Sequence, residues 1–439
     1  MTPVACDLLL TAEYVLTQDE ERAIIENGFV AVHNGNVLAV GPQKRASDYT
    51  PVRRLDLGAA LILPGLVNAH THVSMTFLRG FADDLPLLEW LNNHIFPVEK
   101  HLTAEIVELG TLLGCAEMTR TGTTALQDMY LIEDAVISGV DKAGLKARLG
   151  DGIFAFPTPR CPSVEASFDL ARRHAELVKN TKRLRTGIMP HTVYTTTPEI
   201  LVRCRDLADE LNLPLHIHAA ESPAETALCL QNFGGRPIAL LDRAGLLGPT
   251  TTLAHAVDLT DEELDRLAAT GTVVAHCPRS NMKLSSGAAR FDDMRARSIP
   301  VGLGTDGAAS NNALNMFGEM NTCALLHKVS GDPTAAPAAS VLDAATLGGS
   351  KALCWDGLGA LTPGAPADLI ALDLTAPNLL PMYSPVSHLV YAATGHEVRL
   401  TVVDGEVLYE DGRYTRFDGE SLFKEAAKLK RWVLDKAGR

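Results

Sequence analysis

Pro64-Gly65-Leu66-Val67-Asn68-Ala69-His70-Thr71-His72 carries a short apolar run into two histidines that lie two residues apart. On a β-strand, residues i and i+2 point to the same side, so both imidazoles would project together. Parallel-strand barrels hold their active sites at the carboxyl ends of the strands. Two of 14 histidines can also fall this close by coincidence. The motif predicts a first barrel strand over 61–67, followed by two metal ligands, His70 and His72.

The chain after this motif, to about residue 362, alternates short apolar runs with longer helical patterns. Such alternation is typical of parallel strands joined by helices. Seven further strands are predicted at Thr123–Gln127, Ala147–Phe154, Thr186–Pro190, Pro214–His218, Thr251–His255, Val273–His276 and Pro300–Gly304. With the strand over 61–67 they make eight, so residues 62–362 are predicted to form an α/β fold, the (β/α)8 or TIM barrel.

The two ends of the chain have a different pattern, rich in short β runs and turn residues. Asp404-Gly405 between two apolar runs is a strong hairpin signal. We expect residues 1–61 and 363–439 to form one small discontinuous β-sandwich domain. An amphipathic helix over Ser421–Ala437 is expected to close the chain.

Composition narrows the class of protein. The chain has 439 residues and a net charge of −14, which disfavours nucleic acid and anionic membranes as partners. A neutral or cationic small molecule fits this charge, although acidity also serves solubility alone. No apolar run reaches the ~18 residues of a membrane span. The eight cysteines form no CxxC pair, and no signal peptide is evident, so a cytoplasmic location is expected.

Two more candidate ligands lie at the ends of predicted strands. His218 ends one strand, and Asp306 directly follows the last one. Taken alone, His218 would be a buried core histidine and Asp306 a turn residue. At the same end of neighbouring strands, His70, His72, His218 and Asp306 together give three nitrogen donors and one oxygen donor. This set suits one divalent metal ion, Zn²⁺ first and Fe²⁺ or Mn²⁺ as alternatives.

Residues able to move protons lie nearby. Glu221 follows His218 by three residues, where a carboxylate can take a proton from a metal-activated water and pass it on. His255 ends the next strand and could orient the attacking water or stabilise charge. The alternatives are a surface glutamate and a core histidine. Glu221, His255 and Asp306 are therefore the candidate catalytic residues.

The order of these motifs resembles the amidohydrolase superfamily and its deaminase/chlorohydrolase branch. The resemblance rests on the opening motif at 64–72, on His218-Ala219-Ala220-Glu221, on His255, on residues 304–312 and on Gly364-Ala365-Pro366-Ala367-Asp368-Leu369. It covers nearly the whole chain. Two-metal members carry a modified lysine on the fourth strand, and none stands at 186–191, so one metal is expected.

A closer resemblance is to 5′-methylthioadenosine/S-adenosylhomocysteine deaminases, through residues 75–85, Glu89-Trp90-Leu91 and Phe96-Pro97-Val98-Glu99. The resemblance implies that Glu99 binds the ribose hydroxyls, that His191 binds substrate and that Trp90 lines the nucleoside pocket. Glu221 and Asp306 would also contact the substrate.

One departure bears on the substrate. Some members place an arginine just past the third strand, suited to a homocysteine carboxylate, but this chain has Asp151 near that place. Arg160 is a candidate for a second substrate-binding arginine in a loop that aligns poorly. A missing cation would weaken binding of an amino-acid tail, which favours methylthioadenosine over S-adenosylhomocysteine.

The resemblance implies hydrolytic deamination of the 6-amino group of an adenine nucleoside. A first alternative is an enzyme of the same branch that acts on guanine, cytosine or a triazine. A second is a catalytically inactive barrel that serves as a scaffold, although inactive members typically lose their metal ligands. A homo-oligomer is expected only by analogy with the family.

Overall fold

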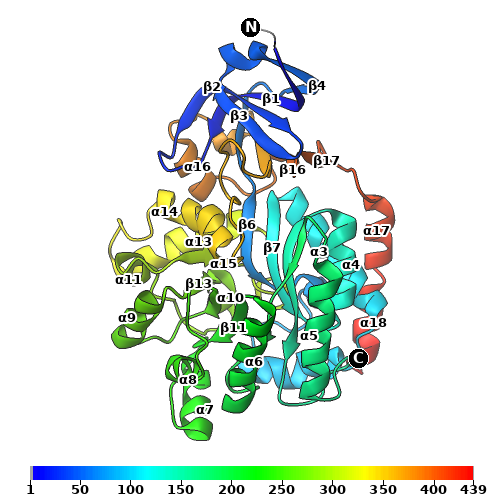
Figure 1. The fold of residues 1–439 in the computed structure, drawn as a ribbon, viewed down its shortest axis with the longest axis vertical. Coiled ribbons are helices and arrows are strands. Elements are labelled where there is room, and N and C mark those ends of the chain that lie inside the picture. The colour runs from blue at the N-terminus through cyan, green and yellow to red at the C-terminus, as the bar shows by residue number, and fades with distance from the viewer. Residues whose placement is uncertain (1–2, 439) are drawn as a thin grey trace.

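The structure is a computed structural model that describes residues 3–438. Figure 1 shows a β-rich layer at one end and a mixed α/β body below it. The strands of the body are β6 (Leu66–Thr71), β7 (Thr123–Tyr130), β8 (Lys146–Ile153), β9 (Leu184–Thr186), β10 (Met189–Pro190), β11 (Leu215–Ala219), β12 (Thr251–His255), β13 (Val273–His276) and β14 (Val301–Leu303).

The strands of the body all pair in parallel. One sheet has the order β10-β8-β7-β6 with β9 beside β8, and the other has the order β11-β12-β13-β14. Parallel bridges from Ile188 to Leu215 and from Thr192 to His218 join the two sheets. At the other seam, the Asp306 amide donates to the His70 carbonyl at 3.0 Å. The result is a parallel, barrel-like core, as the alternating pattern predicts.

The first predicted barrel strand is divided in two. Residues 61–67 fall into β5 (Ala60–Pro64), which belongs to the terminal layer, and β6. Gly65 stands at the junction, where a Cβ atom would lie 2.1 Å from the Thr124 hydroxyl. An apolar run alone does not show where one strand passes from one sheet into another. The predicted strand 186–190 is likewise split, into β9 and β10.

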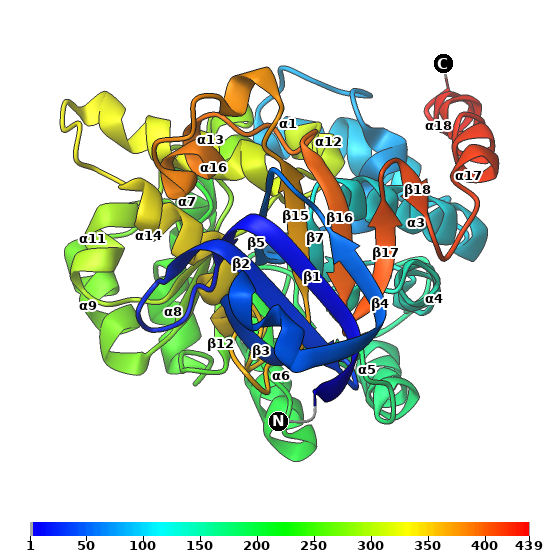
Figure 2. The ribbon, with the colours of Figure 1, turned by 90° about the horizontal axis from the view of Figure 1, so that it is seen from above.

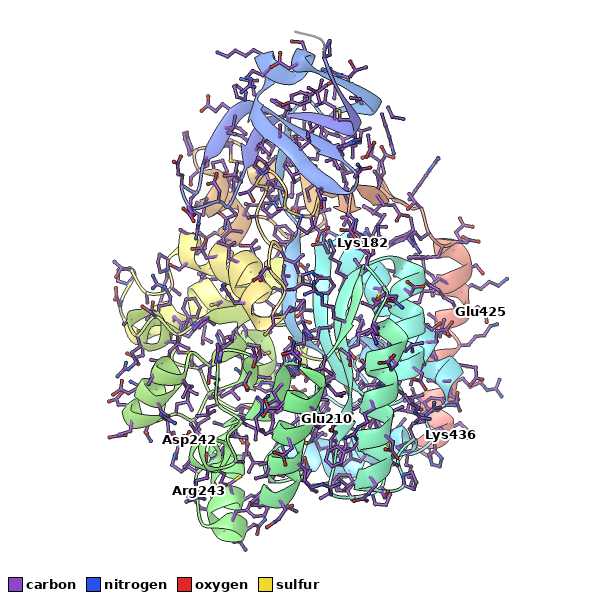
Figure 3. The ribbon with its side chains drawn as sticks, in the orientation of Figure 1. Lys182, Glu210, Asp242, Arg243, Glu425 and Lys436 are labelled. Carbon is purple, nitrogen blue, oxygen red and sulfur yellow. The ribbon has the colours of Figure 1, made fainter. Side chains whose placement is uncertain are left out.

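Helices cover the outside of the core, and charged side chains such as Glu210 and Asp242 lie on them (Figure 3). These helices are α3 (Ala104–Arg120), α4 (Glu133–Ala143), α5 (Val164–Val178), α6 (Pro198–Leu211), α7 (Pro223–Phe233), α8 (Pro237–Arg243), α9 (Asp261–Thr270), α11 (Phe291–Ala296), α13 (Met316–Leu326) and α14 (Ala338–Asp343). Several begin with a side-chain cap, as at Thr260, whose hydroxyl accepts from the Glu263 amide in a capping box.

Shorter helical segments lie in the loops and at the chain end. They are η1 (Gln43–Asp48), η2 (Val73–Leu78), α1 (Leu87–Trp90), η3 (Leu91–Ile95), α2 (Phe96–Glu99), α10 (Pro278–Lys283), α12 (Ala308–Asn311), η4 (His327–Ser330), η5 (Ala344–Gly348), α15 (Gly349–Ala352), η6 (Pro377–Leu379), α16 (Pro385–Tyr391), α17 (Gly419–Ala426) and α18 (Leu429–Lys436). The single helix predicted over 421–437 is therefore two. No helix in residues 3–438 has the length and apolar character needed to cross a membrane.

The two ends of the chain build one nine-stranded sheet. Its members are β1 (Val4–Leu16), β2 (Ile24–His33), β3 (Asn36–Pro42), β4 (Tyr49–Asp56), β5, β15 (Leu369–Asp373), β16 (Val398–Val403), β17 (Glu406–Glu410) and β18 (Arg413–Tyr414). Figure 2 shows the N- and C-terminal strands side by side. The pairing of β5 with both β1 and β15 joins them into one hydrogen-bonded sheet, rather than the two sheets of the predicted sandwich.

The predicted hairpin and a buried ion cluster tie this sheet to the core. Asp404 and Gly405 both have positive φ, 47° and 75°, as a two-residue turn between β16 and β17 requires. The buried Lys146 ammonium, at the start of β8, lies 2.7 Å from carboxylate oxygens of Asp368 and of Asp404. The amino end of the barrel strands therefore faces the terminal sheet, and the carboxyl end faces away from it.

Candidate metal centre and active site

Four side chains meet at the carboxyl ends of the core strands. His70 lies on β6 and His72 directly follows it, His218 lies on β11, and Asp306 follows β14. Nε2 of His72 lies 3.3 Å from Nε2 of His218. Asp306 Oδ1 lies 3.4 Å from His70 Nε2 and 3.3 Å from His72 Nε2. The structure brings together all four ligands predicted from the sequence.

The other polar atom of each of these side chains is held by a neighbour. His70 Nδ1 lies 2.8 Å from His216 Nε2, His72 Nδ1 contacts the Met129 carbonyl, and His218 Nδ1 lies 2.8 Å from the His191 carbonyl. Such outer contacts fix the tautomer and the ring orientation of a metal-binding histidine. The three Nε2 atoms are thereby left to face one another.

Asp306 is oriented in the same way. Its Oδ2 accepts hydrogen bonds from Ser280 at 2.5 Å and Ser310 at 2.7 Å, and Oδ1 is left toward the histidines. The residue has φ of 58°, a left-handed conformation that is uncommon outside glycine and clusters at functional sites. Buried His70 Nε2 has no hydrogen-bond partner among the described residues. An unpaired ring nitrogen facing a carboxylate oxygen fits a site that holds a cation.

The protonation states suit a metal. Burial lowers the pKa of His70 to about 4 and also lowers the pKa values of His72 and His218. Burial acts to raise the pKa of Asp306, but the surrounding histidines outweigh it and hold that pKa well below its usual range. Three neutral imidazoles and one carboxylate are a donor set that Zn²⁺ accepts.

Glu221 and His255 face each other beside this cluster. His255 Nε2 lies 3.9 Å from Glu221 Oε2, and His255 Nδ1 lies 2.9 Å from Asn281 Oδ1. Burial raises the pKa of Glu221, although His255 opposes the rise. Burial acts to lower the pKa of His255, but Glu221 and Asp306 outweigh it and raise the pKa. Both pKa values are therefore shifted upward, as is common for groups that exchange protons at an active site.

A pocket of about 670 Å³ opens above these groups. Its floor includes His72, His218, Glu221, His255 and Asp306. Its walls are largely apolar and aromatic, as binding pockets for small organic molecules generally are. The wall residues are Met75, Leu87, Trp90, Leu91, Ile95, Phe96, Met129, Leu131, Phe154 and Leu284, with Glu99, Tyr130, Gly152, His191, Thr192 and Tyr194 as the remaining lining.

Five of the six predicted substrate-binding residues line this pocket, Glu221 and Asp306 in its floor and Glu99, His191 and Trp90 in its walls. Glu99 is only 6% exposed, and Tyr130 Oη donates to its Oε1 at 2.6 Å. Burial raises the pKa of Glu99 to about 7, and the hydrogen bond from Tyr130 limits the rise. The His191 ring stacks on Phe154 with centroids 4.4 Å apart. Trp90 completes the wall.

Arg160 is placed elsewhere. It does not line the pocket; its guanidinium pairs with Asp134, and its side chain is 42% exposed. Asp134 also contacts the buried His174 at 2.7 Å. The poorly aligning loop therefore holds Arg160 in a surface ion pair instead of pointing it at the pocket. No lysine or arginine lines the pocket in the part of the chain that the structure describes.

Several residues of the site were not predicted from the sequence. His216 had a usable signal, because it lies two residues before His218 on the same strand and so shares its inward face. Ser280 and Ser310 lie in loops after β13 and β14, where no periodicity marks them. Tyr130 ends β7, so its position at a strand end could have indicated it. Phe154 carries no signal that separates a pocket wall from core packing.

Comparison with known proteins agrees with this geometry. The amidohydrolase family model matches residues 61–408. The chain is 62% identical, over 99% of both chains, to a 5-methylthioadenosine/S-adenosylhomocysteine deaminase from Nitratidesulfovibrio vulgaris. It is 40% identical, over 96% of this chain and 97% of the relative, to a 5′-deoxyadenosine deaminase from Methanosarcina mazei.

Solved structures agree as well. A zinc-bound adenosine deaminase from Xanthomonas campestris superposes with a TM-score of 0.96 and 38% identity, over 99% of this chain and 100% of the other. An atrazine chlorohydrolase from Arthrobacter aurescens, complexed with zinc, shares the fold, with a TM-score of 0.89 and 22% identity over 96% and 100% of the two chains. On its sequence, its fold and its matched relatives, the chain belongs to the amidohydrolase family.

Proposed function

We propose that this chain hydrolytically deaminates the 6-amino group of an adenine nucleoside, with 5′-methylthioadenosine as substrate and 5′-methylthioinosine as product. One observation carries the proposal: a single pocket joins a polar floor, with Glu221 and Asp306, to a buried carboxylate, Glu99, across an apolar wall. The floor suits water attack on a ring carbon, and Glu99 suits two vicinal hydroxyls. Relatives named for this activity are 52–62% identical over nearly the whole chain.

We propose that His70, His72, His218 and Asp306 hold one divalent ion, which is zinc. The unpaired His70 Nε2 and the donor set support this assignment, as does the zinc named in two similar structures. Fe²⁺ and Mn²⁺ suit the same donors less closely. When bound, such an ion lowers the pKa of a water molecule toward neutral and so supplies the nucleophile.

Glu221 is the proton carrier in this proposal. Its carboxyl group protonates the purine ring nitrogen next to C6 as water attacks that carbon. It then gives a proton from the water to the departing amine, which leaves as ammonia. His255 lies within 3.9 Å of Glu221, and with Asp306 it orients the attacking water. Burial raises the pKa of Glu221, which favours the protonated form that this step needs.

Glu99 is proposed to bind the ribose, held by the hydroxyl of Tyr130. Its carboxylate can accept from the 2′- and 3′-hydroxyls together. Trp90 and Phe154 supply the apolar surface on which the nucleoside rests. His191, fixed through its Nδ1 by Thr195 at 2.9 Å, is proposed to contact the substrate beside Phe154, on which its ring stacks.

The pocket favours a small apolar group at the 5′ position. A homocysteine tail carries a carboxylate, and burying it without a partner costs free energy. The described pocket lining offers no cation, and Arg160 is committed to Asp134. We therefore propose a preference for methylthioadenosine over S-adenosylhomocysteine.

The test is ammonia release by the zinc-loaded protein on methylthioadenosine, S-adenosylhomocysteine, adenosine, guanine and cytosine, side by side, together with chloride release on atrazine. We expect the highest kcat/KM on methylthioadenosine and the lowest values on the three compounds without a ribose. Fast turnover of guanine, cytosine or atrazine would overturn the nucleoside assignment. Equal kcat/KM values on both thioether nucleosides would overturn the tail preference alone. If the folded, metal-loaded protein turns over none of these compounds, the inactive scaffold is the remaining alternative.

Three coarser features of the organisation are also proposals. The eight parallel strands, counting β9 and β10 as one, are proposed to close as a (β/α)8 barrel; the contact between Asp306 and His70 across the last seam supports closure. The barrel domain is proposed to span 65–362, because β5 pairs in the terminal sheet, with 1–64 and 363–439 as the second domain. A cytoplasmic location is supported by eight free cysteines, seven of them buried.

A further inference from the structure

A second cluster of ligand-type side chains lies on the outer side of the core. Val273 and Ala275 of β13 belong to the apolar cluster that fills the core beside Val67 and Ala69. Because side chains alternate along a strand, His276 points the other way, toward the helices. It does not line the pocket. The residues that it meets are Cys323, on α13, and His327, which directly follows α13.

The three side chains converge as metal ligands do. Cys323 and His327 are four residues apart, so they lie on one face of the helical segment. Their ligand atoms and that of His276 all lie within 4.8 Å of one another. His276 and Cys323 are buried, and His327 is half-buried. Strand and helix thus bring one thiol and two imidazoles to a single point.

The spacing of the two imidazoles favours a metal over a hydrogen bond. His276 Nε2 and His327 Nε2 are 3.3 Å apart, the same separation as between His72 Nε2 and His218 Nε2. Two nitrogens on a tetrahedral zinc ion are about 3.3–3.4 Å apart, given Zn–N bonds of ~2.0–2.1 Å. A direct N–H···N hydrogen bond is normally shorter. His276 Nδ1 has no partner among the described residues, so the ring makes its polar contact through Nε2 alone.

The cluster has an approach from solvent. A hollow of about 1440 Å³ is lined by Phe291, Asp292, His327 and Ala335, among other residues. The Phe291 ring stacks on the His327 ring, with centroids 5.5 Å apart. His327 therefore lies between this hollow and the cluster, since His276 and Cys323 do not line the hollow. An ion entering the cluster would pass His327, and a water molecule could serve as its fourth ligand. Asp292 also lines the hollow, where it pairs with Arg295 at 2.8 Å.

We propose that His276, Cys323 and His327 form a second metal site, which takes a zinc ion and is separate from the catalytic pocket. A thiolate with two imidazoles suits zinc better than it suits Mg²⁺ or Ca²⁺. Binding releases the thiol proton of Cys323 to solvent. The ion would clamp the end of α13 to β13 and so stabilise the fold there.

The clamp would also act on the catalytic loop. Glu319, on α13, accepts from Asn311 Nδ2 at 2.6 Å, and the same amide donates to the Thr305 carbonyl at 2.6 Å. These contacts connect α13 to the segment that carries Asp306. A metal ion that fixes α13 would therefore help to hold Asp306 in place, without touching the substrate.

The test measures metal content and cobalt spectra of the purified full-length protein. We expect two zinc ions per chain in the wild type and one in Cys323→Ser and in His327→Gln. Cobalt separates the sites, because a thiolate-to-cobalt charge-transfer band can arise only where a cysteine is a ligand. The catalytic cluster contains no sulfur. The band should be present in the wild type, absent in Cys323→Ser and strongly reduced in His327→Gln.

Cys204→Ser is the matched control, because Cys204 is also fully buried and helical but lies in no such cluster. It should keep both zinc ions and the cobalt band. His327 is half-buried, so His327→Gln remains informative if Cys323→Ser fails to fold. One zinc ion per wild-type chain together with no charge-transfer band would overturn the proposal and leave a hydrogen-bonded histidine pair. This result is independent of the deaminase assignment, because it is read without substrate.

Discussion

The floor and the wall of the pocket are built in different ways. The floor residues His218 and His255 stand on regular strands and His72 directly follows one, so the parallel sheet brings all three together. The wall residues Trp90 and Glu99 end two very short helical segments, α1 and α2, which flank η3 in the connection between β6 and α3. The floor holds the groups proposed for chemistry, and the wall holds those proposed for choosing the substrate.

The difference shows which part of a site depends on the fold and which depends on a loop. Strand ends are set by the whole hydrogen-bonded core, so a floor residue is fixed by many contacts. The wall segment is set by its own packing, which can change while the core stays the same. Changes to the floor should therefore lower kcat for every substrate, whereas changes to the wall should alter KM for some substrates only.

The largest effect is expected from Glu221→Gln. The amide keeps the shape of the side chain but cannot move protons, so kcat should fall about 10²–10⁴-fold on every nucleoside. Metal content should stay the same, because Glu221 is not one of the four ligands. Stopped or steady-state ammonia assays check this result. The exposed Glu105→Gln is the control and should have no effect, and near-normal turnover by Glu221→Gln would falsify its role.

The second prediction concerns His216, a residue that supports the floor through its contact with His70. His216→Phe removes the ring that contacts His70 Nδ1 at 2.8 Å, while an aromatic ring still fills the buried space. Loss of such an outer contact typically costs about 10–100-fold in metal affinity or activity. Competition with a chelator measures the affinity. If the affinity for zinc is unchanged, His216 fills space and does not orient His70.

The third prediction concerns Glu99→Gln, a substitution in the wall of the pocket. A hydrogen bond to a charged group contributes about 1.5–3 kcal/mol, so kcat/KM on methylthioadenosine should fall about 10–150-fold. Most of the loss should appear in KM. An adenine nucleoside that lacks both ribose hydroxyls is the matched substrate, and its kcat/KM should change little. A similar loss on both substrates would show that Glu99 acts on the fold or the chemistry instead of on the ribose.

These predictions also mark what the sequence could and could not reveal. The meeting of the four proposed ligands with Glu221 and His255 was predictable because each lies in or just after an apolar run, and parallel strands place such positions together. The division of residues 61–67 between β5 and β6 was not predictable, since an apolar strand has the same pattern in the terminal sheet and in the core. Arg160 was misplaced because loop geometry decides between a pocket and a surface ion pair. Phe154 needed the spatial arrangement before it could be assigned to the wall.

The pH dependence of kcat/KM also distinguishes the wall residue Glu99 from the residues of the floor. Burial raises the pKa of Glu99 to about 7, so below that pH the group takes up a proton and loses acceptor capacity. We expect kcat/KM on methylthioadenosine to fall as pH drops below about 7, by at most tenfold per unit. Glu99→Gln should remove this limb of the profile. If the Glu99→Gln variant keeps this acidic limb of the kcat/KM profile, the group that titrates belongs to the floor and not to the wall.

The same shift predicts an effect on stability. The pKa of Glu99 is higher in the folded chain than its ordinary value of 4.5, so the unfolded chain loses this proton first as pH rises. Its contribution to stability therefore decreases between pH 4.5 and about 7 and is constant above that range. Glu99→Gln should be more stable than the wild type at pH 8, with a smaller difference at pH 4. Denaturant unfolding at the two pH values measures this change.

The smallest effect is expected from Tyr130→Phe. The substitution removes one hydroxyl that donates to Glu99 and leaves the aromatic wall intact. A single hydrogen bond contributes about 0.5–1.5 kcal/mol, which is roughly 2–13-fold in kcat/KM. The loss should be absent when Glu99 is already Gln, because the two residues act through one contact. Additive losses in the double variant would show that Tyr130 has a separate role.

The nine-stranded sheet has a consequence for how the chain is made. β5 lies between β1 and β15, and β15 begins only at Leu369. At about 5–20 residues per second, a ribosome takes roughly 15–60 s to make the intervening chain. During that time one edge of the apolar β5 has no partner and can pair with other chains. Newly made protein should therefore need protection from aggregation until late in synthesis, and a chain that stops before Leu369 should never lose that need.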